Sequence, residues 1–228
     1  MKKILFVCML SFLSMALYAQ DYNFLPKEGK VLKFKGEVKS PMQSEPMVTE
    51  VSQYVEKISD NEYKTVVETK SESNAEANQK QEVVYKIDGD RAVVNMKDVL
   101  DQQLAQTGGT AEIVEQKGDF SYPVNITKDS KLEPVYVTLK MNVQGMDLDM
   151  EMSYDNRVIE GEEVVKVPAG EFTCLKISEE LVILVMGQEQ ITKLTYWIAK
   201  GVGPVKQNVS AMGGMVESTQ ELVAIEDK

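Results

Sequence analysis

Short runs of alternating apolar and polar residues, each ended by turn residues, constrain this chain more than any other feature. They begin at Val31 and recur almost to the C-terminal end. Successive side chains of a strand point to opposite faces, so this alternation is typical of strands with one buried face. The pattern predicts an all-β fold, a strongly curved antiparallel sheet. The expected strands are 31–38, 47–58, 62–69, 82–87, 135–143, 146–154, 157–167, 172–186, 190–199, 205–210 and 215–225.

The strongest local signal is a hairpin around Gln144-Gly145. A two-residue loop there sets Val143 against Met146 and fixes every pair that follows. One face then becomes wholly apolar and the other polar, and a slip by one residue would destroy both patterns. The apolar face holds Val137, Leu139, Met141, Leu148, Met150 and Met152, and the polar face holds Thr138, Lys140, Asn142, Asp147, Asp149 and Glu151.

Three other segments depart from simple alternation. A second hairpin is expected to turn at Gly89-Asp90, which sets Asp88 opposite Arg91. The polar stretch 70–81 is expected to be a solvated loop or a frayed strand end. The run 181–186 is apolar at every position, so both of its faces should be covered.

One amphipathic helix is expected between the early and the late strands. Asn95 can cap its start, and Gly108-Gly109 can end it. Its apolar residues recur at helical spacing and should form one buried stripe. They are Met96, Val99, Leu100 and Leu104.

The composition excludes several kinds of chemistry. The chain has no histidine, which removes the commonest general base and the commonest metal ligand. Its formal net charge of −11 opposes binding to nucleic acid. Cys174 lacks the electropositive neighbour that a reactive thiolate needs, so a buried structural thiol is expected there. Gly-x-Ser-x-Gly, Ser-x-x-Lys and phosphate-loop motifs are all absent, and the glycines at 201–203 precede a strand, not a helix. The sequence therefore indicates no catalytic residue and no enzyme.

Two groups of residues could suggest a metal. Asp147, Asp149 and Glu151 form a flat row on one strand face, which differs from a wrapped calcium loop and favours a solvated surface. Methionine is in surplus, and Met150 and Met152 have a spacing that copper(I) sites use. The hairpin register places both on the apolar face, which favours core packing or an adaptable apolar surface. No metal and no cofactor are expected.

The first residues have the features of an export signal. Lys2 and Lys3 precede an apolar run from Ile4 to Ala16, and Ala19 offers a small residue for cleavage. No later stretch approaches the ~20 apolar residues that span a bilayer. We expect cleavage near Ala19, a periplasmic or secreted protein, and one β-rich domain over residues 20–228.

Two motifs in the C-terminal half resemble a known family. Residues 167–177 read VPAGEFTCLKI, and residues 196–206 read YWIAKGVGPVK. From about 118 to 225 the chain resembles an uncharacterised family of exported bacterial proteins, sometimes labelled TapB-like. The resemblance implies a spiral β-roll, related in shape to the half-barrels of periplasmic lipoprotein carriers. It implies no established activity and no functional residues.

Three functions follow as hypotheses. The first is a non-catalytic periplasmic protein that binds an apolar or amphipathic ligand such as lipid. The second is a structural or assembly protein of the envelope that acts through a protein partner. The third, a hydrolase with paired carboxylates, has the least support because no spacing singles out a pair. For the first, the expected ligand-binding residues are Leu139, Met141, Leu148, Met150 and Met152.

Overall fold

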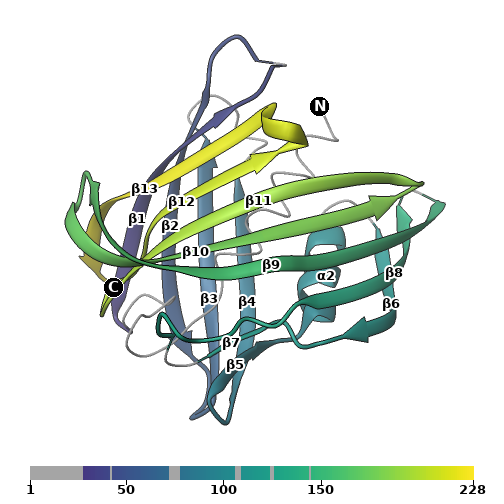
Figure 1. Ribbon diagram of the computed structural model, residues 1–228, viewed down its shortest axis with the longest axis horizontal. Coiled ribbons are helices and arrows are strands. Elements are labelled where there is room, and N and C mark those ends of the chain that lie inside the picture. The colour runs from purple at the N-terminus through teal and green to yellow at the C-terminus, as the bar shows by residue number, and fades with distance from the viewer. Residues whose placement is uncertain (1–27, 42, 72–77, 106–108, 124–125, 144) are drawn as a thin grey trace.

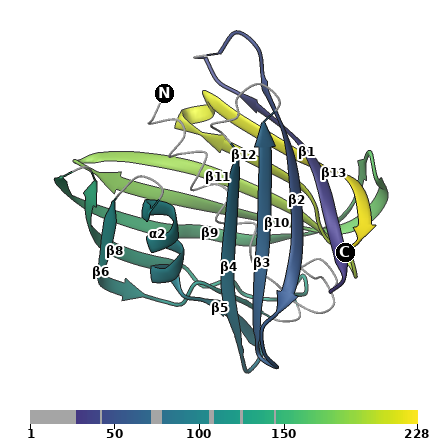
Figure 2. The same ribbon diagram turned by 180° about the vertical axis from the view of Figure 1, so that it is seen from behind.

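The computed structural model describes residues 28–41, 43–71, 78–105, 109–123, 126–143 and 145–228. The expected export signal, its expected cleavage position and Gly108 lie outside these residues, as do Gln144 and half of the stretch 70–81. In the described part of the chain, thirteen strands form one antiparallel sheet, accompanied by one α-helix. Figures 1 and 2 show that the sheet is curved and that the helix lies at its open side. The fold class predicted from the sequence is confirmed. The strands are β1 (Lys30–Lys39), β2 (Met47–Lys57), β3 (Glu62–Ser71), β4 (Gln79–Asp88), β5 (Arg91–Val94), β6 (Thr110–Lys117), β7 (Ser121–Pro123), β8 (Val135–Val143), β9 (Met146–Val167), β10 (Gly170–Val185), β11 (Gln188–Ala199), β12 (Gly203–Ala211) and β13 (Val216–Asp227); α2 covers Met96–Ala105 and the short 3-10 helix η3 covers Met212–Gly214.

The order of the strands explains why the sheet rolls up. It runs β6-β8-β9-β10-β11-β12-β13-β1-β2-β3-β4-β5-β7, so β6 and β7 lie at opposite ends. Only Gly118, Asp119 and Phe120 link these two strands. A fully extended residue spans at most about 3.6 Å, so this link keeps the two ends of the sheet close at one corner. The link is tight, because a Cβ atom at Gly118 would lie 2.6 Å from the carbonyl oxygen of Pro134.

The predicted hairpin between β8 and β9 is confirmed in every pair. Val143 pairs with Met146, Met141 with Leu148 and Leu139 with Met150. The hairpin of β4 and β5 also has the predicted register, with Asp88 opposite Arg91. In both cases the sequence specified the register because only one pairing separates apolar from polar side chains.

Three strand predictions were wrong. The two strands expected at 146–154 and 157–167 are one continuous strand, β9, because the chain forms a β-bulge at Asn156-Arg157 instead of breaking there. Asn156 has a φ of 49°, and two residues of β9 there face Glu179 of β10. The strands β6 and β7 were not predicted, since neither alternates cleanly. The expected loop 70–81 is shorter, because β3 continues to Ser71 and β4 starts at Gln79.

The predicted helix is present and its apolar stripe is buried. The Lys97 amide donates to the Asn95 side-chain oxygen at 3.1 Å, which confirms the cap. The Gly109 amide donates to the Leu104 carbonyl at 2.9 Å beyond the last turn. α2 contacts β6 at one end of the sheet order and β4 near the other. It therefore spans the gap that the rolled sheet leaves open (Figure 2).

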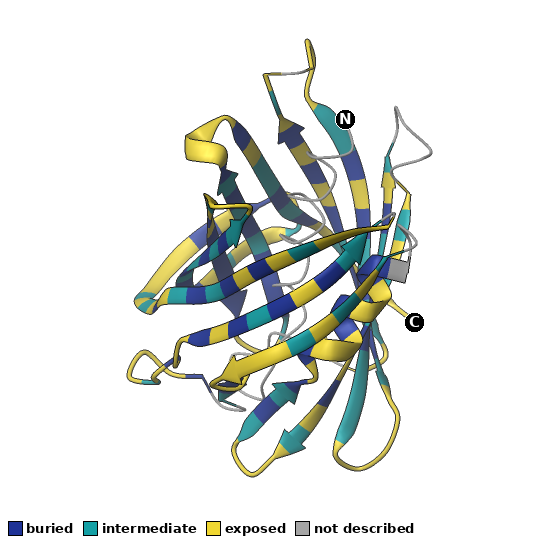
Figure 3. Cartoon of the chain, turned by 90° about the vertical axis from the view of Figure 1, so that its right-hand side faces the viewer, coloured by how far each residue is buried: buried dark blue, intermediate teal, exposed yellow. Residues whose placement is uncertain are grey.

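The apolar run 181–186 is covered on one side only, which contradicts the prediction that both faces are covered. Leu181 and Ile183 point into the core, whereas Val182 and Leu184 on the outer face are half-buried. Ile191, which pairs with Val182, is 41% exposed. Figure 3 shows the alternation of buried and exposed residues along these long strands.

The β8–β9 hairpin yields a matched pair of substitutions. Met150→Asp should lower the free energy of unfolding by several kcal/mol, because it places an unpaired carboxylate in the core. Asp149→Asn, on the exposed face one residue away, should change it by less than about 0.5 kcal/mol. Urea unfolding of both variants measures the difference, and equal effects would contradict the observed faces of the hairpin.

Candidate functional site

The sequence-predicted ligand residues form most of one inner side of the roll, here called the apolar wall. It consists of Leu139, Met141, Met150 and Met152, all at most 5% exposed. The fifth predicted residue, Leu148, is only half-buried near the hairpin tip. The wall belongs to one large core cluster that also contains the buried stripe of α2. The predicted residues are thus brought together, and the helix belongs to the same packed cluster.

The opposite inner side of the roll carries buried polar side chains among apolar ones, and we call these polar residues the polar band. Strand pairing aligns Tyr196, Gln207, Gln220, Gly36 and Thr49 in one row across β11, β12, β13, β1 and β2. Tyr196 belongs to the same core cluster as the apolar wall, so this row lies on the inner face. The band consists of Thr49, Gln53, Thr65, Gln207 and Gln220, each at most 5% exposed.

Gly36 makes room for the polar band. A Cβ atom there would lie 2.4 Å from Thr49 Oγ1 and 3.2 Å from Gln220 Cγ. The two polar side chains therefore occupy the space that a side chain at Gly36 would need. The side-chain oxygen of Gln220 is buried, and no hydrogen-bond partner for it occurs in the described part of the chain. Sequence analysis missed the band, because only the pairing of distant strands aligns its members.

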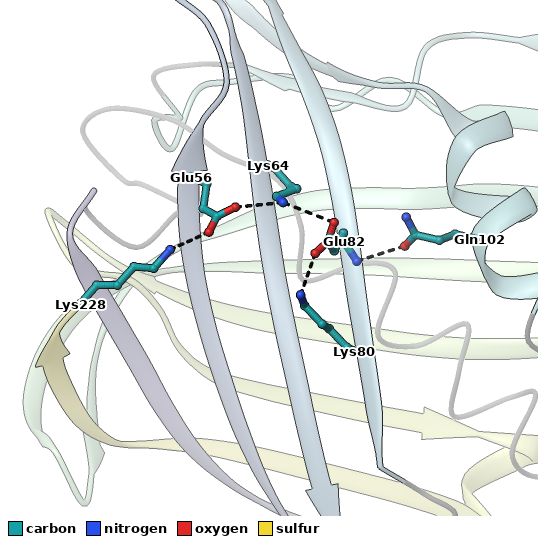
Figure 4. Close-up of polar contacts among 6 residues, drawn as sticks. All are labelled: Glu56, Lys64, Lys80, Glu82, Gln102 and Lys228. Carbon is teal, nitrogen blue, oxygen red and sulfur yellow. Dashed lines mark hydrogen bonds and ion pairs between the residues drawn. The ribbon is translucent and has the colours of Figure 1, made fainter.

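The helix α2 is tied to the sheet by few polar contacts. The Glu82 backbone amide donates to the Gln102 side-chain oxygen at 3.0 Å. Glu82 itself ends a ladder of ion pairs on the outer face of β2, β3 and β4, shown in Figure 4. Lys64 bridges Glu56 at 2.9 Å and Glu82 at 3.3 Å. Lys228 also pairs with Glu56, at 2.8 Å, so the ladder reaches the C-terminal residue.

A buried group of charges, here called the clasp, connects the end strand β7 to β9 and β10. Its members are Arg157, Glu179 and Tyr122, and both charged side chains are almost fully buried. Arg157 Nε donates to Glu179 Oε1 at 3.1 Å, and the Tyr122 hydroxyl donates to the same oxygen at 2.5 Å. The guanidinium also lies 4.4 Å from the Tyr122 ring centroid and donates to the Glu133 carbonyl at 2.8 Å.

The protonation states of the clasp are fixed by its surroundings. Burial, together with the negative charge of Glu179, raises the pKa of Tyr122 well above its usual value, so the phenol keeps its proton. Burial alone would lower the pKa of Arg157, but Tyr122 and Glu179 raise it overall. Tyr122 therefore stays protonated and Arg157 stays charged at physiological pH, which suits a structural role better than proton transfer.

One sequence feature, the rarity of arginine, could have predicted the clasp. The chain has only two arginines, Arg91 and Arg157, and both donate to Ser121 of β7. Arg91 Nε reaches the Ser121 hydroxyl at 2.8 Å, and Arg157 Nη2 reaches its carbonyl at 3.5 Å. Arginine is favoured over lysine for buried ion pairs, so its rarity beside many lysines was informative.

The two family-like motifs meet around Trp197. Lys176 of the first motif and Lys206 of the second lie 5.8 and 5.7 Å from the Trp197 ring centroid. The Trp197 indole donates to Glu163. Other motif residues form a second core cluster, where the Ala169 amide donates to the Leu222 carbonyl at 3.0 Å. The motifs thus build the fold, and their polar groups pair with acidic residues outside the motifs, Lys176 with Glu160 and Lys206 with Glu221.

The remaining chemical candidates give no reactive group. Cys174 is fully buried, and burial raises the pKa of its thiol to about 12. Asp147 and Asp149 are exposed and line a shallow groove of about 470 Å³ on the outer face of β6, β8 and β9. Within the described residues, no three histidine, cysteine or acidic side chains could together hold a metal ion. No helix in the same part of the chain is long and apolar enough to cross a membrane.

These features define an all-β protein with an open, rolled antiparallel sheet, an apolar wall and a helix across the gap. A family model described as DUF3108-like matches residues 27–222, so the chain belongs to the DUF3108-like family. The likeness extends far upstream of residue 118, where the motif resemblance began, and the TapB-like label is not confirmed. The comparison with curated proteins finds no match.

Two crystal structures share the fold. A candidate lipoprotein from Parabacteroides distasonis superposes with a TM-score of 0.58 at 16% identity, covering 91% of this chain and 99% of that chain. A candidate exported protein with a YmcC-like fold from Bacteroides fragilis gives 0.55 at 16% identity, covering 93% and 100%. At this identity the likeness shows the fold alone.

The clasp provides a test of what holds the roll together. Arg157→Met should lower the free energy of unfolding by about 3–5 kcal/mol, because Glu179 stays buried without its counter-charge. The double variant Arg157→Met/Glu179→Leu should recover part of that loss, because it removes both charges. Denaturant unfolding decides the point, with half-buried Arg91→Met as the matched control. A single and a double variant of equal stability would show that the ion pair itself is unimportant.

The outer ion-pair ladder predicts an acid dependence. Hydrogen bonds from Lys228 and Lys64 lower the pKa of Glu56 to about 2 from its usual 4.5. A lowered carboxyl pKa contributes stability that is complete above about pH 4.5 and is lost as the pH falls toward 2. Glu56→Gln should therefore flatten the stability profile in that window at low salt, whereas Glu50→Gln, on the same strand, should not. Identical profiles for parent and Glu56→Gln would refute the pairing.

Proposed function

We propose that this protein is a non-catalytic protein of the cell envelope that binds an amphipathic ligand, such as lipid, inside its rolled sheet. The observation on which this depends is the two-sided interior. The apolar wall on β8 and β9 suits an acyl chain, because burial of apolar surface contributes about 25 cal/mol per Å². The polar band on β12, β13, β1 and β2 suits a polar head group, with the Gln220 oxygen as an acceptor.

The path for the ligand is the gap that α2 spans. The helix packs between β4 and β6 through its apolar stripe, and its described polar tie to β4 is the bond from the Glu82 amide to Gln102. Moving one helix exposes the apolar wall, whereas opening any other part of the interior would break ladder hydrogen bonds. The charged start of the chain, its apolar run and the two similar crystal structures support placement in the envelope.

The second candidate is a structural or assembly protein of the envelope that acts through protein–protein contacts. It is favoured by the burial of the apolar wall, whose residues pack in one cluster with α2. Most apolar strand faces pack in this way without any ligand. The two candidates differ in whether the protein carries a lipid when it is isolated.

Native mass spectrometry of protein purified gently from its own envelope tests the first candidate. We expect an adduct with the mass of a lipid, and displacement of a hydrophobic dye by fatty acid. Gln220→Leu should weaken monoacylglycerol binding about tenfold, because a head-group hydroxyl loses the oxygen that accepts its hydrogen bond. Thr219→Val, on the opposite face of β13, should leave it unchanged. If no adduct appears and no lipid class raises the melting temperature, the second candidate stands.

A further inference from the structure

One apolar surface of the protein lies outside the roll, at the ends of its longest hairpins. Val182 and Leu184 lie half-buried on the outer face of β10, with Ile191 exposed beside them on β11. Met186, in the turn between these strands, is 81% exposed. Met146, at the tip of the neighbouring β8–β9 hairpin, is 61% exposed. We call these five residues the tip surface.

The two hairpin tips lie side by side at one extremity of the molecule. Both views of the ribbon show the β8–β9 and β10–β11 ends together, beyond the shorter hairpin of β12 and β13 (Figures 1 and 2). The pairing explains this reach, because β11 extends four residues beyond Thr192, where its pairing with β12 ends. The tip surface therefore protrudes.

The tips are also free of charge. Gly145-Met146 and Met186-Gly187-Gln188 contain no ionisable side chain, in a chain in which 27% of residues are charged. The first charges behind the tips, Asp147 and Glu189, are both acidic and exposed. Methionine and glycine at protruding turns present flexible apolar contacts that adapt to a soft surface.

These features together identify the occupant of the tip surface. We propose that the two hairpin tips insert into the interfacial region of a lipid bilayer with zwitterionic head groups. A protruding apolar tip fits a deformable surface, whereas a protein partner would need a matching hollow. Five side chains also offer much less than the ~800 Å² per partner that a stable dimer buries. The acidic flanks repel anionic lipids, which directs the tips to a surface without net charge.

This inference goes beyond the proposed function, because docking requires no ligand inside the roll. Binding of this kind is weak and reversible, as it is for a single short lipid anchor. It would hold the open side of the roll near a bilayer from which a lipid could be taken up. If the protein does not bind vesicles, the proposal of ligand binding is unaffected. That proposal is tested separately by the lipid adduct and the dye displacement.

Co-sedimentation of the full chain with phosphatidylcholine vesicles tests the proposal. The variants are Met186→Glu and Met186→Glu/Met146→Glu, whose exposed sites should leave the melting temperature unchanged. The matched control is Val164→Glu, 64% exposed near the opposite end of β9. All variants share the apolar residues 4–16, so their contribution cancels in the comparison. We expect the double variant to lose vesicle binding about tenfold and the control to keep it.

Four results would overturn the proposal. These are no binding by the parent chain, equal loss in the Val164→Glu control, unchanged binding in the double variant, and preference for phosphatidylglycerol vesicles. Sedimentation velocity without lipid tests the other possible occupant of the tip surface, a second copy of the chain. Self-association abolished by Met186→Glu would assign the tip surface to a second copy of the chain, and would also overturn bilayer docking.

Discussion

The rolled shape depends on an ion pair buried where the two ends of the sheet meet. Glu179 of β10 receives hydrogen bonds from Arg157 of β9 and from Tyr122 of β7, the last strand in the sheet order. β7 is three residues long and has few ladder hydrogen bonds of its own. The clasp therefore fixes β7 by side-chain contacts that main-chain pairing does not supply. A buried pair of this kind costs desolvation energy, so its value lies in specifying one arrangement of the sheet ends.

Closing the roll by side chains instead of main-chain pairing leaves a gap between the ends of the sheet, which α2 covers. A continuous barrel would satisfy every strand edge, but it would open only by breaking its ladder. Here α2 spans the space between β4 and β6 and buries one apolar stripe against the core. The clasp and the long hairpins are held by buried charges and ladder hydrogen bonds, whereas α2 is held mainly through its apolar stripe.

The sequence predicted local structure well and long-range structure poorly, for a physical reason. The register of the β8–β9 hairpin and the cap at Asn95 follow from neighbours in the chain, which alternation and capping chemistry reveal. The bulge at Asn156 was predicted to be a break between two strands, because polar residues are common in turns as well as in bulges. The polar band was missed, since Gln207 and Thr49 are brought into one row only by pairing across four strands. The wall was predicted residue by residue, while its role as a ligand site stays a prediction.

The position of the family-like motifs indicates how function could vary on this fold. Residues 167–177 and 196–206 lie around Trp197 and contribute to the second core cluster, so these two motifs serve packing. The polar band residue Gln220 and the tip residue Met186 both lie outside these two stretches. Changes there would leave the clasp and both cores intact, because neither side chain contributes to them. Substitutions in the interior band or at the tips therefore test binding separately from the packing that the motifs provide.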